Sequence, residues 1–108
     1  MITVTVFKKN NMIVGAQVEG HAEYAGKGKD IVCSAVSMLY INLVNSLENF
    51  TQDDKEVNGS RKINFENVIL KNMPSDEAEL LFRSFHLGIT TVEQKYGKRY
   101  IEILEQDV

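Results

Sequence analysis

The longest apolar stretch of the sequence runs from Ile31 to Leu47 and has the spacing of a helix, with apolar side chains recurring every three or four residues. Asp30 is a good N-cap residue, so we expect a helix from Asp30 to about Phe50. Glu48 is its single charged residue after the cap, which indicates a helix covered on two sides, and a second subunit could supply one cover. Polar residues interrupt the stretch, and it falls short of the roughly 20 apolar residues of a membrane span. No span is therefore predicted.

The rest of the sequence has patterns of strands and of one further helix. Alternating and β-branched residues predict four strands, over residues 2–8, 12–19, 62–71 and 100–104. The third strand has a break in its alternation that suggests a bulge near Asn67, and residues 52–61 are expected to be a solvated connection. A second helix begins after the capping Ser75 and ends before Gly97, and its apolar stripe consists of Ala78, Leu81, Phe82, Phe85, Ile89, Val92 and Tyr96. The order ββαβαβ predicts an α+β fold, a mixed β-sheet packed with two helices, in a single domain over residues 1–108.

Composition and charge exclude several classes of function. The 108 residues carry 12 basic and 15 acidic side chains, and a net charge of -3 does not favour binding to the phosphate backbone of a nucleic acid. We expect no direct nucleic acid binding. One cysteine cannot form an internal disulfide, and no signal-peptide pattern opens the sequence, so we expect a cytoplasmic protein.

One place in the sequence brings chemically useful side chains together. His21 ends the second strand, a mobile glycine-containing loop is expected from Gly20 to Asp30, and Cys33 follows in the first turn of the apolar helix. Because the chain must fold back between strand and helix, the loop can bring the imidazole and the thiol together. The start of a helix favours a thiolate through unpaired N–H groups and the helix dipole, and Lys27 and Lys29 add positive charge. The same amides could stabilise an oxyanion.

Two further polar residues accompany this pair, and their roles stay open at this stage. Asp30 could cap the helix or orient His21, because a carboxylate beside the sulfur would oppose thiolate formation. Ser37 lies one helical turn after Cys33 on the same face, so its hydroxyl could reach the His21 ring or a substrate. A lone cysteine in a helix is also often a small buried hydrophobe, and the residues alone leave that interpretation open for Cys33.

The sequence does not contain the residue spacings that other thiol chemistries, metal sites or nucleotide-binding sites require. The sequence has no second cysteine for a Cys-x-x-Cys pair, and Leu39 stands where a cysteine phosphatase would carry arginine. One cysteine and two histidines do not make a convincing zinc set, and the loop glycines do not follow a nucleotide-binding pattern. We expect no metal and no cofactor. His86, in the second helix, is expected to be an ordinary boundary residue.

The segment Gly20-His21-Ala22, a glycine-bearing loop and the segment Asp30–Ser37 together resemble the signature of the ribosomal-processing cysteine protease family. The resemblance covers the whole chain. It implies a cysteine endopeptidase that removes a short N-terminal extension from a large-subunit ribosomal protein, cutting after an aromatic residue. By position it implies that Cys33 is the nucleophile and His21 the general base and acid. Ser34 stands where a small residue, often alanine, is expected.

The resemblance further implies that Asp30 and Ser37 match supporting motif positions, that the loop over residues 23–29 closes over the peptide substrate, and that the protein forms a homodimer. A second hypothesis is of another class. In it the protein is a non-catalytic dimeric α/β module that binds a ribosomal or assembly partner, and Cys33 is a packed helix residue.

Overall fold

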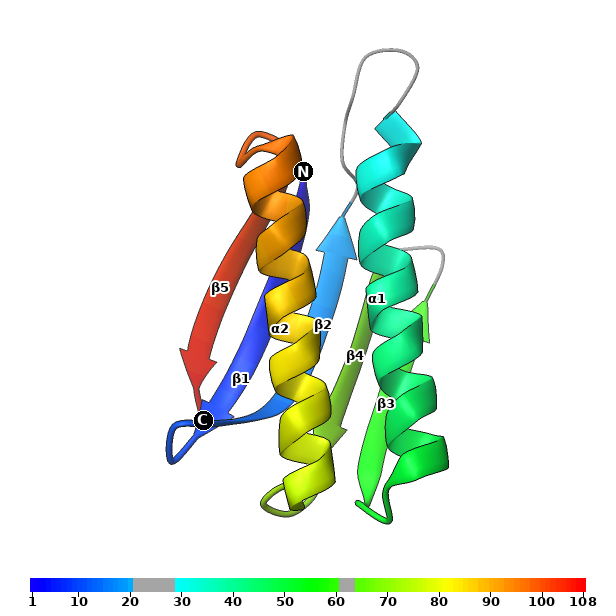
Figure 1. Cartoon of the computed structure of the whole chain (residues 1–108), viewed down its shortest axis with the longest axis vertical. Coiled ribbons are helices and arrows are strands. Elements are labelled where there is room, and N and C mark those ends of the chain that lie inside the picture. The colour runs from blue at the N-terminus through cyan, green and yellow to red at the C-terminus, as the bar shows by residue number, and fades with distance from the viewer. Residues whose placement is uncertain (21–28, 61–63) are drawn as a thin grey trace.

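The computed structural model describes residues 1–20, 29–60 and 64–108, with Lys29 and Asp30 described by their backbone alone. Five strands form one sheet, and both helices lie on the same face of it (Figure 1). The elements in chain order are β1 Ile2–Lys9, β2 Met12–Gly20, α1 Lys29–Phe50, β3 Lys55–Ser60, β4 Phe65–Leu70, α2 Asp76–Tyr96 and β5 Ile101–Asp107. The strand order is β3-β4-β2-β1-β5, and only the β1–β5 pair is parallel. The expected α+β class, with a mixed sheet and two helices, is confirmed.

Strand β3 corrects the prediction of a solvated connection over residues 52–61. It pairs antiparallel with β4 at the edge of the sheet, and most of its residues are exposed. Its sequence, Lys-Glu-Val-Asn-Gly-Ser, contains a single large apolar residue and therefore has no apolar alternation to reveal a strand. Backbone pairing to β4 and the ion pair between Lys55 and Glu48 of α1 hold it in place instead.

Two local details also differ from expectation. The bulge expected near Asn67 is absent from β4, because Asn67 pairs in unbroken register with Gln17 on one side and Asn58 on the other. The register shift lies instead between Phe7 and Lys8, beside the turn of the β1–β2 hairpin. Side-chain hydrogen bonds link Asn67 to Gln17 and to Asn58, so the row of amides that broke the apolar alternation is a polar ladder across three strands.

The core lies between the helices and the sheet. The stripe expected on α2 is confirmed, since Ala78, Phe82, Phe85, Ile89 and Val92 are buried there. Ser75 caps α2 as expected, because its Oγ accepts a hydrogen bond from the Ala78 N–H at 3.1 Å.

Helix α1 has the length and hydropathy of a membrane-crossing helix between Ile31 and Phe50, although the sequence pattern predicted no span. One face of α1 packs into the core through side chains that are at most 3% exposed: Val32, Val36, Tyr40, Leu43 and Leu47. This burial is typical of the core helix of a folded domain, which meets the same criteria of length and composition.

Candidate active site

The predicted cysteine lies on the wall of a hollow of about 410 Å³, which we call the Cys33 hollow. Strands β1, β2, β3 and β4, helix α1 and Asn64 contribute to it. The lining residues are Ile2, Val18, Gly20, Cys33, Val36, Ser37, Ile41, Ser60, Asn64, Phe65 and Glu66. Cys33 is half-buried and forms no disulfide. The only thiol of the chain is therefore accessible from a cavity large enough for a side chain of a ligand.

The geometry of α1 places the thiol near the positive end of the helix. Cys33 is the fifth residue of α1, just beyond the first turn in which it was expected. Side chains of a helix lean toward its N-terminus, so the thiol leans toward the turn whose N–H groups lack intrahelical partners. Ser37, one turn further along, is exposed and borders the same hollow, as the spacing predicted.

Asp30 does not stand outside the helix as its cap. The described helical backbone already includes Lys29, so Asp30 lies within the helix. The prediction placed the boundary at Asp30 because this residue directly precedes the apolar run. Because the side chain of Asp30 lies outside the described residues, its proposed contact with His21 stays a prediction.

Gly20 marks the point where β2 leaves the sheet beside the hollow. Its φ is +86°, and a Cβ at this position would lie 2.5 Å from the backbone oxygen of Met1. Its N–H donates a hydrogen bond of 2.9 Å to the Asn64 carbonyl. Only glycine satisfies both the backbone conformation and the close approach. The residue directly before His21 is thus fixed at the edge of the Cys33 hollow.

His21 and the predicted loop over residues 21–28 lie outside the described residues, so the contact between His21 and Cys33 stays a prediction. The arrangement on either side of the loop is compatible with it, because Gly20 and Cys33 line one hollow.

The sequence did not single out the walls of the hollow. Ile2, Val18 and Phe65 were recognised only as strand residues, and the order of the strands brings them together. Glu66, in contrast, could have been recognised from the sequence pattern of its strand. It shares a face of β4 with the buried Val68 and Leu70, so it places a charge on the side of the sheet that the helices cover.

Tyr40 is a core residue of α1 that carries a buried hydroxyl. Its side chain is 3% exposed, and its hydroxyl has no hydrogen-bond partner among the described residues. Burial, and secondarily the negative charge of Glu66, raise the pKa of Tyr40 well above its ordinary value. No hydrogen bond joins the Tyr40 hydroxyl to the Glu66 carboxylate.

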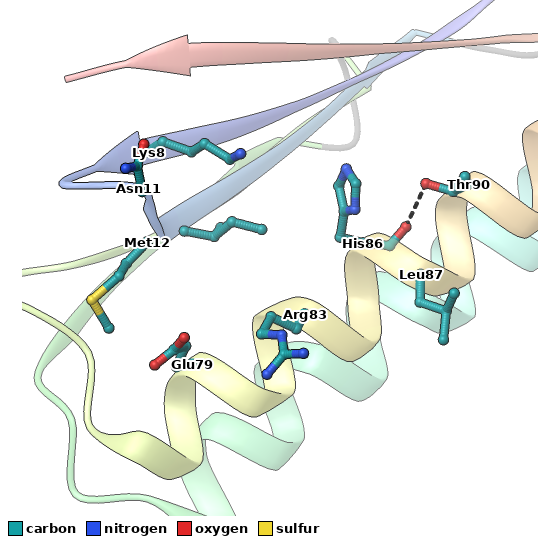
Figure 2. A pocket seen from close by; sticks show the side chains of 9 residues that line it. Lys8, Asn11, Met12, Glu79, Arg83, His86, Leu87 and Thr90 are labelled. Carbon is teal, nitrogen blue, oxygen red and sulfur yellow. Dashed lines mark hydrogen bonds between the residues drawn. The ribbon is translucent and has the colours of Figure 1, made fainter.

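A second hollow, of about 450 Å³, lies between the β1–β2 hairpin and α2 (Figure 2). Lys8, Arg83 and the half-buried His86 line it, and none of its lining residues borders the Cys33 hollow. The His86 carbonyl accepts a hydrogen bond from the Thr90 hydroxyl, as it would in an ordinary helix. Within the described ranges, no group of three or more His, Cys, Asp and Glu side chains could hold a metal ion.

Comparison with known families decides the class of the protein. The family model described as cysteine protease Prp matches residues 1–102. The chain belongs to the cysteine protease Prp family. Curated Prp relatives are the ribosomal processing cysteine proteases Prp of two Staphylococcus aureus strains, Mu50 and NCTC 8325. Each is 24% identical over 99 residues, which cover 91% of this chain and 93% of the relative.

Solved structures share the fold of this Prp-family chain. The S. aureus ribosomal processing protease Prp, crystallised with a covalently linked product peptide, matches with a TM-score of 0.88 at 23% identity, covering 98% of this chain and 100% of that one. A crystal structure of SMU.848 from Streptococcus mutans matches with a TM-score of 0.86 at 27% identity, covering 100% and 96%. The Prp assignment makes the protein a cysteine protease and decides against the non-catalytic module.

Proposed function

We propose that this protein is an endopeptidase that removes a short N-terminal extension from a large-subunit ribosomal protein, cutting after an aromatic residue. The observation that carries the proposal is the position of Cys33, the only cysteine of the chain, on the wall of a hollow. The curated S. aureus relatives are named ribosomal processing proteases, which supports a ribosomal protein as the substrate.

The proposed mechanism uses Cys33 as the nucleophile. Its thiolate attacks the scissile carbonyl carbon, and N–H groups at the start of α1 hold the oxyanion that forms. His21 protonates the leaving amine as the C–N bond breaks, which leaves an acyl group on the sulfur. His21 then takes a proton from water, which hydrolyses the thioester and releases the thiol. Asp30 and Ser37 support this chemistry by orienting His21 or the substrate.

The walls of the hollow suit the aromatic side chain before the cleavage point. Large apolar side chains contributed by β1, β2 and α1 line it, namely Ile2, Val18, Val36 and Ile41. Binding sites of this kind are mostly apolar and have volumes of about 300–1,000 Å³, a range that includes this hollow. An aromatic ring would bury most of its surface there, whereas a charged side chain would lose its hydration.

Two further parts of the proposal concern the state of the protein. We place the enzyme in the cytoplasm, where thiols stay reduced and ribosomal proteins are made. We also propose a homodimer with α1 at the interface. Its support comes from two apolar side chains that α1 leaves exposed outside the Cys33 hollow, namely Ile31 at 48% and Met38 at 61%.

The test uses a peptide that spans the extension and the start of the mature ribosomal protein. The wild-type protein should cut it once, after the aromatic residue, and Cys33→Ala and His21→Ala should each abolish cleavage. Ser34→Ala is the matched control, because Ser34 is the exposed neighbour of Cys33 and does not line the hollow. Cleavage that persists in Cys33→Ala would exclude this cysteine from the mechanism.

A further inference from the structure

Glu66 is the only charged residue among the described residues that line the Cys33 hollow. The other lining residues are apolar or carry neutral polar groups. The carboxylate of Glu66 lies beside the apolar residues that would receive the peptide. The described lining of the hollow therefore offers a ligand one negatively charged side chain.

The position of Glu66 in the sheet keeps its carboxylate available. Glu66 pairs with Val18 on β2 and with Gly59 on β3, and neither neighbour offers it a polar side chain. A Cβ on Gly59 would lie 3.1 Å from the Glu66 Cγ, so the glycine leaves room for the acidic side chain. Glu66 is exposed, and it forms no hydrogen bond or ion pair through its side chain with any described residue.

We propose that Glu66 determines specificity by binding the side chain of a lysine or arginine that flanks the scissile bond of the peptide. The inference rests on the proposed function, because it assumes that the Cys33 hollow receives the peptide. The peptide would then be recognised by two features, an aromatic ring held by apolar walls and a positive charge held by Glu66. Charge complementarity of this kind contributes mainly to selectivity between substrates.

The experiment measures kcat/KM for a neutral version of the substrate peptide and for a series in which one lysine is moved through the positions around the aromatic residue. Each lysine peptide is compared with norleucine at the same position, which keeps the length of the side chain and removes its charge. The wild-type enzyme should prefer lysine by roughly threefold to tenfold at one position or two adjacent positions, as expected for one partly exposed ion pair.

Variants assign the preference to Glu66. Glu66→Gln should abolish it, so that the lysine and norleucine peptides are cut with equal kcat/KM. Glu66→Lys should reverse it in favour of a glutamate peptide. Glu56→Gln is the matched control, since Glu56 is an exposed acid on β3 that does not line the hollow and should leave the preference intact.

Three results would overturn the inference. The first is equal cleavage of the lysine and norleucine peptides by the wild type, and the second is a lysine preference that survives Glu66→Gln. The third is a lysine preference that appears only in the double variant Arg61→Ala and Lys62→Ala. These two basic residues lie outside the described ranges, and such a result would mean that they, and not the peptide, pair with Glu66 in the wild type. Failure of the proposed function differs from all three, because then no peptide of the series would be cut at the aromatic residue.

Discussion

Gly20 and Cys33 border one hollow, although one ends a strand and the other lies in the helix that follows. The positive φ of Gly20 and its hydrogen bond to Asn64 fix the direction in which the chain leaves β2. The segment that carries His21 therefore begins at the edge of the Cys33 hollow. The sheet and α1 therefore hold Gly20 and Cys33, the two ends of this segment, in position.

Gly20→Ala is predicted to damage both stability and activity. A Cβ at Gly20 would lie 2.5 Å from the Met1 carbonyl oxygen, so the backbone must shift. Gly97→Ala is the matched control, because Gly97 also has a positive φ, +100°, but has open space around its Cβ position. We expect Gly97→Ala to cost about 1–2 kcal/mol of unfolding free energy and Gly20→Ala to cost at least about 1 kcal/mol more.

Urea unfolding measures these free energies, and peptide cleavage at a temperature where both variants are folded measures the effect on the site. Gly20→Ala should lose about tenfold or more in kcat/KM, whereas Gly97→Ala should stay close to wild type. Equal losses in the two variants would show that the carbonyl clash at Gly20 has no role in positioning the site.

Side-chain patterns predicted most of the fold, because most elements bury an apolar face. The α2 stripe and its Ser75 cap are examples in which periodicity and capping chemistry agree. Strand β3 escaped prediction because pairing with β4, and not its own side chains, specifies it. At Asn67 the break in alternation came from a ladder of amides across strands, which a single strand's sequence cannot reveal.

The candidate site was predictable only where its residues are close in sequence. The family signature and the helix start indicated Cys33 and Ser37, and both line the hollow. Ile2 and Phe65 reach the hollow through the strand order β3-β4-β2-β1-β5, which the pattern of apolar residues does not determine. Long-range pairing of strands therefore brings the walls of the hollow together, whereas the local sequence was enough to indicate Cys33 and Ser37.

Core packing of α2 is predicted to dominate stability. Phe82 is fully buried between α2 and the sheet, so Phe82→Ala should cost about 3–5 kcal/mol through lost burial and a residual cavity. Leu80, two residues earlier on the same helix, is 61% exposed, and Leu80→Ala should change the unfolding free energy by less than about 0.5 kcal/mol. Urea denaturation of both variants checks this, and similar losses would contradict the observed orientation of α2.

Asp53 is predicted to link α2 to the segment before β3 in a pH-dependent manner. Ser75 donates two hydrogen bonds to its carboxylate, one from the backbone N–H at 2.8 Å and one from Oγ. Partial burial raises the pKa of Asp53, but the hydrogen bonds from Ser75 and Thr51 outweigh it and hold the pKa below its ordinary value. Since the folded pKa is the lower one, the stabilisation is complete above the unfolded pKa and is lost as the pH falls through the folded pKa.

Asp53→Ala should therefore cost about 1–3 kcal/mol at neutral pH, and the difference from wild type should shrink in acid below the ordinary carboxyl range. Asp54→Ala is the control, because Asp54 is exposed and makes no side-chain hydrogen bond with the described residues. A difference that stays constant from neutral pH to strong acid would refute the linkage.

Removal of the Tyr40 hydroxyl is predicted to be harmless to stability. Because the buried hydroxyl has no partner among the described residues, Tyr40→Phe should be neutral or stabilise the fold by up to about 1 kcal/mol. Tyr40→Ala removes the ring as well and should cost about 3–5 kcal/mol. Thermal unfolding distinguishes the two variants, and a clear loss of stability in Tyr40→Phe would mean that the hydroxyl is hydrogen-bonded.

The most direct test of the account is the mass of the intact enzyme during turnover of the ribosomal extension peptide, quenched with acid within milliseconds. We predict a transient adduct equal to the peptide segment before the cleavage point, mapped to Cys33 after digestion, and absent from Cys33→Ala. Turnover by wild type with no adduct, together with cleavage by Cys33→Ala, would contradict the assignment of Cys33 as the nucleophile.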